Sequence, residues 1–120
     1  MSSRIDKPWI PLDRLDPKAV PAQLGVFELG DDDGVVLHIG RAGGREPFGL
    51  RSAVSAAVAR ATEADWGPAA GVRWELTHGY LSRHRELLMV HVHDHGRGPV
   101  GTPVHQMPVG RLTPPPAPGR

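Results

Sequence analysis

The pattern of apolar and polar residues predicts two neighbouring strands in the first half of the chain. Residues 24–29 alternate, which is typical of a strand because its side chains point alternately to two faces, and residues 35–39 are the expected return strand. Between them, residues 30–34 read Gly-Asp-Asp-Asp-Gly, and an Asp-Gly pair is a strong signal for a tight turn. The sequence therefore predicts a β-hairpin over residues 24–39.

Helical spacing replaces the alternation further along the chain. A glycine-rich loop is predicted at 40–47, followed by a helix from residue 48 or 49 to residue 62. The helix contains no internal proline and is rich in alanine, which has the highest helix propensity. Its apolar residues share one face: Leu50, Val54, Ala57, Val58 and Ala61.

A third strand and a second helix complete the predicted fold. Residues 72–77 alternate again, and residues 80–95 form a helix that Gly96 and the following Gly and Pro residues end. The predicted fold class is α/β (α+β): a small three-stranded, mainly antiparallel sheet with two main helices in the order β-β-α-β-α.

Both ends of the chain differ from this central part. Residues 1–23 contain four prolines and predict an extended arm, in which Trp9 and Ile10 either pack along the domain or contact a partner. Residues 100–120 are rich in proline and glycine, a composition that favours extended or disordered backbone. We therefore divide the chain into an arm (1–23), a domain (24–99) and a tail (100–120).

Composition narrows the function classes. The chain has 120 residues, which suits one domain, and no cysteine, which excludes disulfides, thiolate metal sites and cysteine nucleophiles. Its net charge is +1, so it lacks the strongly basic balance of a protein that coats nucleic acid, although a local basic patch is compatible with it. Neither a secretory signal nor a long apolar run is present, and we expect a cytoplasmic protein without membrane contact.

The glycine-rich loop is a candidate phosphate-binding site. Bare glycine backbone can approach a phosphate closely, arginine binds phosphate through two nitrogens, and the N-terminus of the following helix favours anions. The alternative is a flexible surface loop, and no Walker-type Lys-Ser/Thr pair follows the glycines. The candidate residues are Gly40, Arg41, Gly43, Gly44 and Arg45.

Histidine and tryptophan residues provide weaker candidates. His91 and His95 are four residues apart on the second predicted helix and could bind a metal ion, or could pack or face water. The His-Glu-x-x-His pattern is absent. Trp66 and Trp74 are either stacking platforms for bases or part of the core.

The element order and three short motifs resemble the GIY-YIG nuclease family over residues 24–99. Gly25-Val26-Phe27 stands where the family has Gly-Ile-Tyr, and Leu37-His38-Ile39-Gly40 stands where it has Tyr-Ile-Gly or Tyr-Val-Gly. Phe48-Gly49-Leu50-Arg51 resembles the start of the family's first helix, which carries an arginine. Glu86 lies in the second helix, where the family has its metal-binding glutamate.

This resemblance implies metal-assisted cleavage of phosphodiesters. In it, Arg51 would stabilise charge on the phosphate and Glu86 would hold one Mg²⁺. The chain departs from the family at both tyrosines: Phe27 has no hydroxyl, and His38 offers an imidazole that can act as a base near neutral pH. The asparagine that often follows the family's second helix is also missing, since the chain contains no asparagine.

Three functions therefore stay open. The preferred hypothesis is a non-catalytic GIY-YIG-like module that binds a protein partner or a nucleic-acid phosphate backbone. The second is a divergent Mg²⁺-dependent nuclease that uses His38, Arg51 and Glu86. The third is a small accessory subunit of a larger enzyme complex, held there by the Trp9 arm and the tail.

Overall fold

Four antiparallel strands form a single sheet in the computed structural model, which describes residues 4–103. The strands are β1 (Ile10–Pro11), β2 (Gly25–Gly30), β3 (Val36–Ala42) and β4 (Gly71–Leu76), in the spatial order β1-β4-β2-β3. This confirms the predicted α+β class and the hairpin. The arm contributes the fourth strand, β1, because Ile10 pairs with Val72 along the outer edge of β4.

The β2–β3 hairpin depends on an aspartate in its turn. Gly25 pairs with Ala42 at one end of the two strands, and the register shifts between Leu29 and Gly30 at the other. In the turn, Asp31 Oδ1 accepts the backbone N–H groups of Asp33 and Val35, each at 2.9 Å. The carboxylate thus serves as the acceptor for backbone N–H groups that have no partner in the neighbouring strand.

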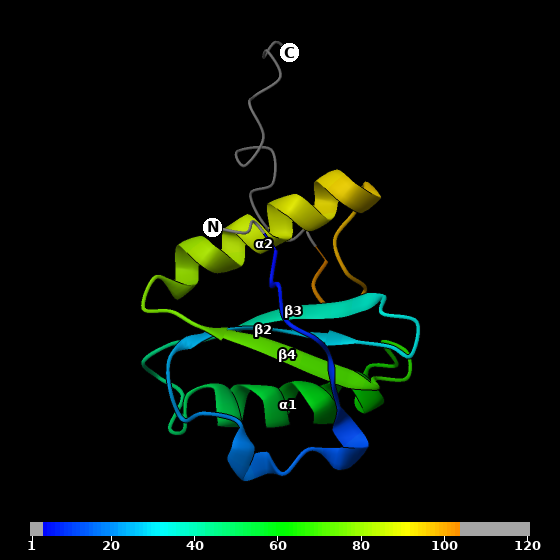
Figure 1. The fold of residues 1–120 in the computed structure, drawn as a ribbon. Coiled ribbons are helices and arrows are strands. Elements are labelled where there is room, and N and C mark those ends of the chain that lie inside the picture. The colour runs from blue at the N-terminus through cyan, green and yellow to red at the C-terminus, as the bar shows by residue number, and fades with distance from the viewer. Residues whose placement is uncertain (1–3, 104–120) are drawn as a thin grey trace.

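The two helices cover opposite faces of the sheet (Figure 1). Helix α1 (Leu50–Glu63) packs on the face that carries Phe27 and Leu29, whereas α2 (Tyr80–His95) packs on the face that carries Val26 and Ile39. The strand period of two produces this division, since neighbouring residues of β2 point to different helices. The core is therefore split into two clusters, one under each helix.

The N-terminal arm passes around the β4 edge of the sheet from one helix to the other (Figure 1). Ile5 is only 2% exposed and belongs to the cluster under α2, whereas Val20 is also 2% exposed and belongs to the cluster under α1. Two short 3₁₀ helices, η1 (Leu12–Arg14) and η2 (Pro17–Ala19), lie between them. The arm is thus packed against both clusters.

The segment after α2 covers the opposite edge of the sheet. The N–H of Gly101 donates to the carbonyl oxygen of Leu37 at 2.7 Å, and Thr102 Oγ1 accepts the N–H of Ile39 at 3.0 Å. This pair of contacts shields part of edge strand β3. The rest of the predicted tail, from residue 104 onward, lies outside the described residues. Within residues 4–103, no helix has the length and apolar character needed to cross a bilayer.

Candidate functional site

A hollow of about 470 Å³ follows β3 between α1, the glycine-rich loop and the segment at Gly101; we call it the β3 groove. Its apolar lining includes Phe27, Ala53, Ala56, Ala57 and Trp66. Its polar lining includes His38, Arg41, Glu46, Arg60, His84 and Thr102. An apolar hollow with a few polar groups around it has the general make-up of a binding site.

His38 occupies the middle of this groove in a fixed orientation. Its Nδ1–H donates to the carbonyl oxygen of Gly101 at 3.0 Å, and its ring stacks on Trp66 with 4.7 Å between centroids. Burial lowers the pKa of His38 below its ordinary value of 6.5, although the Gly101 contact opposes this effect. Burial therefore favours the neutral form of the ring.

Phe27 forms the floor of the groove beneath Gly40. Its side chain is 1% exposed, and its ring centroid lies 5.6 Å from that of His38. A Cβ atom on Gly40 would clash with Phe27 Cζ, so only glycine allows the ring to approach the backbone this closely. Phe27 brings no proton-transferring group to this position, because its ring has no hydroxyl.

Two exposed arginines give the groove its positive charge. Arg41 comes from the end of β3 and Arg60 from α1, and within residues 4–103 neither guanidinium makes a hydrogen bond or an ion pair. The positive charge of Arg60 contributes to the lowered pKa of His38, and that of Arg41 contributes to the lowered pKa of His84. Among the described lining residues, Glu46 alone carries a carboxylate. Phosphate is the natural ligand for two such arginines.

Arg51 points away from this groove. Its Nε–H donates to the carbonyl oxygen of Val20 at 3.0 Å, and its Nη2 donates to that of Lys18 at 3.3 Å. Arg51 therefore joins α1 to the end of the arm. These contacts do not support the prediction that Arg51 binds a phosphate.

Glu86 lies on the other side of the sheet from His38. Its Oε1 accepts Nη1 of Arg83 at 2.5 Å, and the same guanidinium binds both carboxylate oxygens of Glu75, at 2.8 and 3.0 Å. The carboxylates of Glu75 and Glu86 raise the pKa of Arg83, so this group stays charged. Glu86 is two residues from His84, which places it about 200° around the helix from the groove.

The surroundings of Glu86 do not fit Mg²⁺. This ion prefers several oxygen ligands in near-octahedral geometry. The guanidinium of Arg83 instead occupies the position between Glu86 and Glu75. No group of three or more His, Asp or Glu side chains suited to a metal ion exists within residues 4–103. The predicted set of His38, Arg51 and Glu86 is thus distributed over three separate places.

The glycine-rich loop contributes only in part. Arg41 lines the groove together with Gly40, whereas Gly44 and Arg45 are exposed beyond it. Gly43 packs against the Tyr80 ring, since a Cβ atom added to Gly43 would lie only 3.0 Å from that side chain. The start of α1 is not open to an anion, because the N–H groups of residues 50 and 51 donate to arm carbonyls at 2.9 and 3.2 Å.

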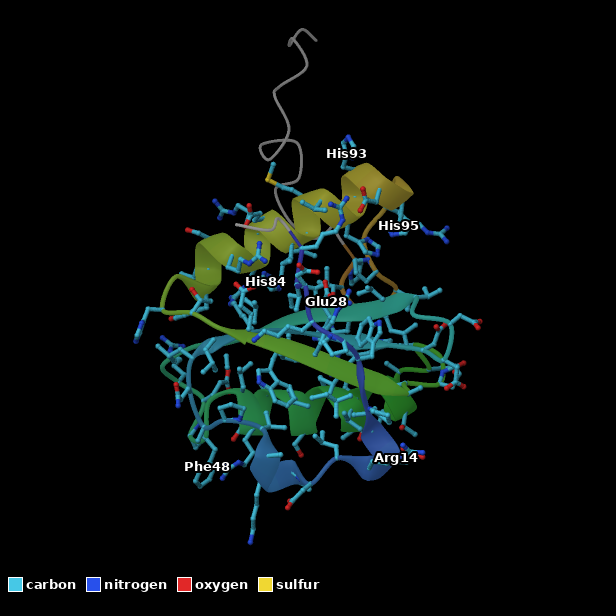
Figure 2. All side chains as sticks on the ribbon, viewed as in Figure 1. Arg14, Glu28, Phe48, His84, His93 and His95 are labelled. Carbon is cyan, nitrogen blue, oxygen red and sulfur yellow. The ribbon has the colours of Figure 1, made fainter. Side chains whose placement is uncertain are left out.

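Trp9 and Ile10, the predicted partner-binding residues, contact the domain itself. Ile10 is part of β1, and the guanidinium carbon of Arg73 lies 4.1 Å from the Trp9 ring centroid. Arg73 in turn donates to Glu28 Oε1 at 2.7 Å, and burial raises the pKa of Glu28. Figure 2 shows Glu28 between the sheet and α2. Both arm residues are half-buried by these contacts.

The sequence did not predict Arg60 and Thr102 as site residues, and it offered Trp66 only as a stacking platform or a core residue. A signal for Arg60 was present, because Ala53, Ala56 and Arg60 follow helical spacing and share a face. No comparable signal exists for Thr102, whose contact with β3 joins residues 63 positions apart.

Comparisons with known proteins place this chain in a family without assigning an activity. No curated protein and no solved structure matches the chain. One family model matches residues 3–94, which is more than half of the sequence and includes the arm, the sheet and nearly all of α2. The chain therefore belongs to the family described as a domain of unknown function, DUF7508.

Proposed function

We propose that this protein is a GIY-YIG-like module that binds the phosphate backbone of a nucleic acid in the β3 groove without cutting it. One observation carries the non-catalytic part of the proposal. Of the residues that the resemblance would make catalytic, only His38 lies in the groove, while Arg51 binds the arm and Glu86 binds Arg83. Phosphodiester hydrolysis needs positive charge and a nucleophile at one place.

The binding part rests on Arg41 and Arg60. Both guanidinium groups are exposed and unpaired within the described chain, so binding a phosphate would break no existing ion pair. They flank a hollow whose apolar floor and neutral His38 ring supply no competing negative charge. Glu46 is the one acidic residue among the described lining residues, and its carboxylate would disfavour a phosphate placed beside it.

The proposal is tested by fluorescence anisotropy titration of labelled single-stranded DNA, single-stranded RNA and duplex DNA at several salt concentrations. Arg41→Ala and Arg60→Ala should each weaken binding for every base sequence. Each should also reduce the slope of log K against log[salt] by about 1, because one phosphate contact is lost. Two contacts agree with a net charge of only +1.

Arg14→Ala provides the matched control. Arg14 is an exposed arginine on η1, at the side of the molecule away from α2 (Figure 2). Its substitution removes the same charge without changing the groove, and binding should stay at the wild-type level. Equal losses in all three variants would indicate non-specific attraction, and unchanged binding by both groove variants would contradict the proposal.

A further inference from the structure

A second hollow, of about 610 Å³, lies at the C-terminal end of α2, away from the proposed phosphate site. The β2–β3 turn and residues 97–100 form its other walls. These walls are mostly apolar and include the exposed side chains of Val35 and Val100. The imidazoles of His91 and His95 also line it, so two nitrogen ligands face a largely apolar space.

The two imidazoles are close enough to share one ion. They are four residues apart on α2, and their ring centroids are separated by 4.3 Å with 38° between the ring planes. A metal–imidazole bond is about 2.0–2.1 Å long, so one ion can bind two imidazole nitrogens that are at most about 4 Å apart. Two histidines at this helical spacing present their rings on one face, as in other helical zinc sites.

A backbone contact fixes the ring of His91. Its Nδ1–H donates to the carbonyl oxygen of Arg97 at 3.0 Å, which leaves the lone pair on Nε2 for a metal. Ligating histidines commonly have such a partner on the second nitrogen. Burial also lowers the pKa of His91, which favours the neutral ring.

The charges around His91 and His95 are compatible with a bound cation. The last turn of a helix carries partial negative charge and favours cations. Asp94, which is bound to Arg4 at 2.8 Å, adds a nearby negative charge, whereas Arg97 adds a positive one. Imidazole ligands suit copper, nickel and zinc, whereas Mg²⁺ and Ca²⁺ prefer oxygen.

We propose that His91 and His95 together bind one divalent transition-metal ion of the copper, nickel and zinc group. Within residues 4–103 no third histidine or carboxylate joins them, so the remaining coordination positions face the hollow and are open to water or a small ligand. Among these ions Cu²⁺ should bind most tightly, following the general order of affinities for nitrogen sites.

Isothermal titration calorimetry with Cu²⁺, Ni²⁺ and Zn²⁺ tests this site on the full chain. Wild type should bind one ion at the pair, and His91→Ala and His95→Ala should each weaken that binding by about tenfold or more. Electron paramagnetic resonance of the Cu²⁺ form should show two coordinating imidazole nitrogens from this pair, and one after either substitution. Circular dichroism establishes that each variant is folded.

His93→Ala is the matched control. His93 is on the same helix, its side chain is 89% exposed, and it points away from the sheet (Figure 2). This variant should bind the metal as wild type does. His95 is itself exposed, so its substitution should leave the fold intact and keeps the test decisive if His91→Ala unfolds. Unchanged affinity in His95→Ala, or an equal loss in His93→Ala, would overturn the proposal.

Discussion

The side chain of Arg51 donates to the backbone carbonyl oxygen of Val20, 31 residues earlier in the chain. This contact links the first turn of α1 to the point where the arm enters the core. Val20 is fully packed in the cluster under α1, so the contact fixes a carbonyl group next to a buried side chain. The family resemblance assigns Arg51 to phosphate chemistry, whereas in the structure its side chain holds the arm against α1.

Arg51→Ala should destabilise the protein without changing nucleic-acid affinity. The loss of charged hydrogen bonds to two carbonyl groups should lower the free energy of unfolding by about 1.5–3 kcal/mol. Urea denaturation followed by circular dichroism measures this change. The control is Arg85→Ala, an exposed position on α2 that should change stability by less than about 0.5 kcal/mol. A stable Arg51→Ala variant with weakened binding would support the opposite assignment.

Gly40→Ala should disturb the floor of the β3 groove. The added Cβ would clash with Phe27 Cζ and lie 2.9 Å from His38 Nε2, so the buried phenyl ring must move. Overpacking of this kind costs about 1–3 kcal/mol of stability. Gly44→Ala is the control, because a Cβ there meets nothing within 4 Å. Urea midpoints that fall equally for both variants would contradict this explanation.

Stability should decrease when the solution becomes mildly acidic. His84 donates from Nε2 to the carbonyl oxygen of Ile39 at 3.0 Å, and burial lowers its pKa below the ordinary value of 6.5. The unfolded chain therefore takes up the proton first. The stabilising contribution is complete above pH 6.5 and is lost as the pH falls toward the lowered pKa of the folded state.

Urea midpoints at about pH 7.5 and about pH 5 measure this dependence. His38 and His91, whose pKa values are also lowered by burial, add to it in wild type. His84→Gln should reduce the difference between the two midpoints. Identical pH dependence in wild type and His84→Gln would contradict the role of this ring.

Local sequence patterns predicted most of the regular structure. The alternation at 24–29 and the return strand expected at 35–39 after the Asp-Gly turn correspond to β2 and β3, because such short-range patterns are visible in the sequence itself. The helical spacing from Leu50 to Ala61 corresponds to α1 for the same reason. A strand of two residues has no period to detect, so β1 could be identified only from its pairing with Val72.

The candidate site was less predictable because its contacts are distant in sequence. Motif matching placed His38, Arg51 and Glu86 together, yet Arg51 is held by the arm and Glu86 by Arg83. The contact of Arg51 joins residues 31 positions apart, which no local pattern identifies, whereas Arg83 and Glu86 are a local i,i+3 pair on α2. Of the two arginines that line the groove, Arg41 belongs to the predicted glycine-rich loop, whereas Arg60 belongs to no motif.

The most direct test of the account is incubation of labelled branched, single-stranded and duplex nucleic acids with saturating protein in Mg²⁺ or Mn²⁺. A native gel measures binding, and a denaturing gel of the same samples measures cleavage. We predict that wild type and Glu86→Ala retain the bound nucleic acid equally and leave it intact. Cleavage by wild type that disappears in a folded Glu86→Ala variant would contradict the account and establish a nuclease.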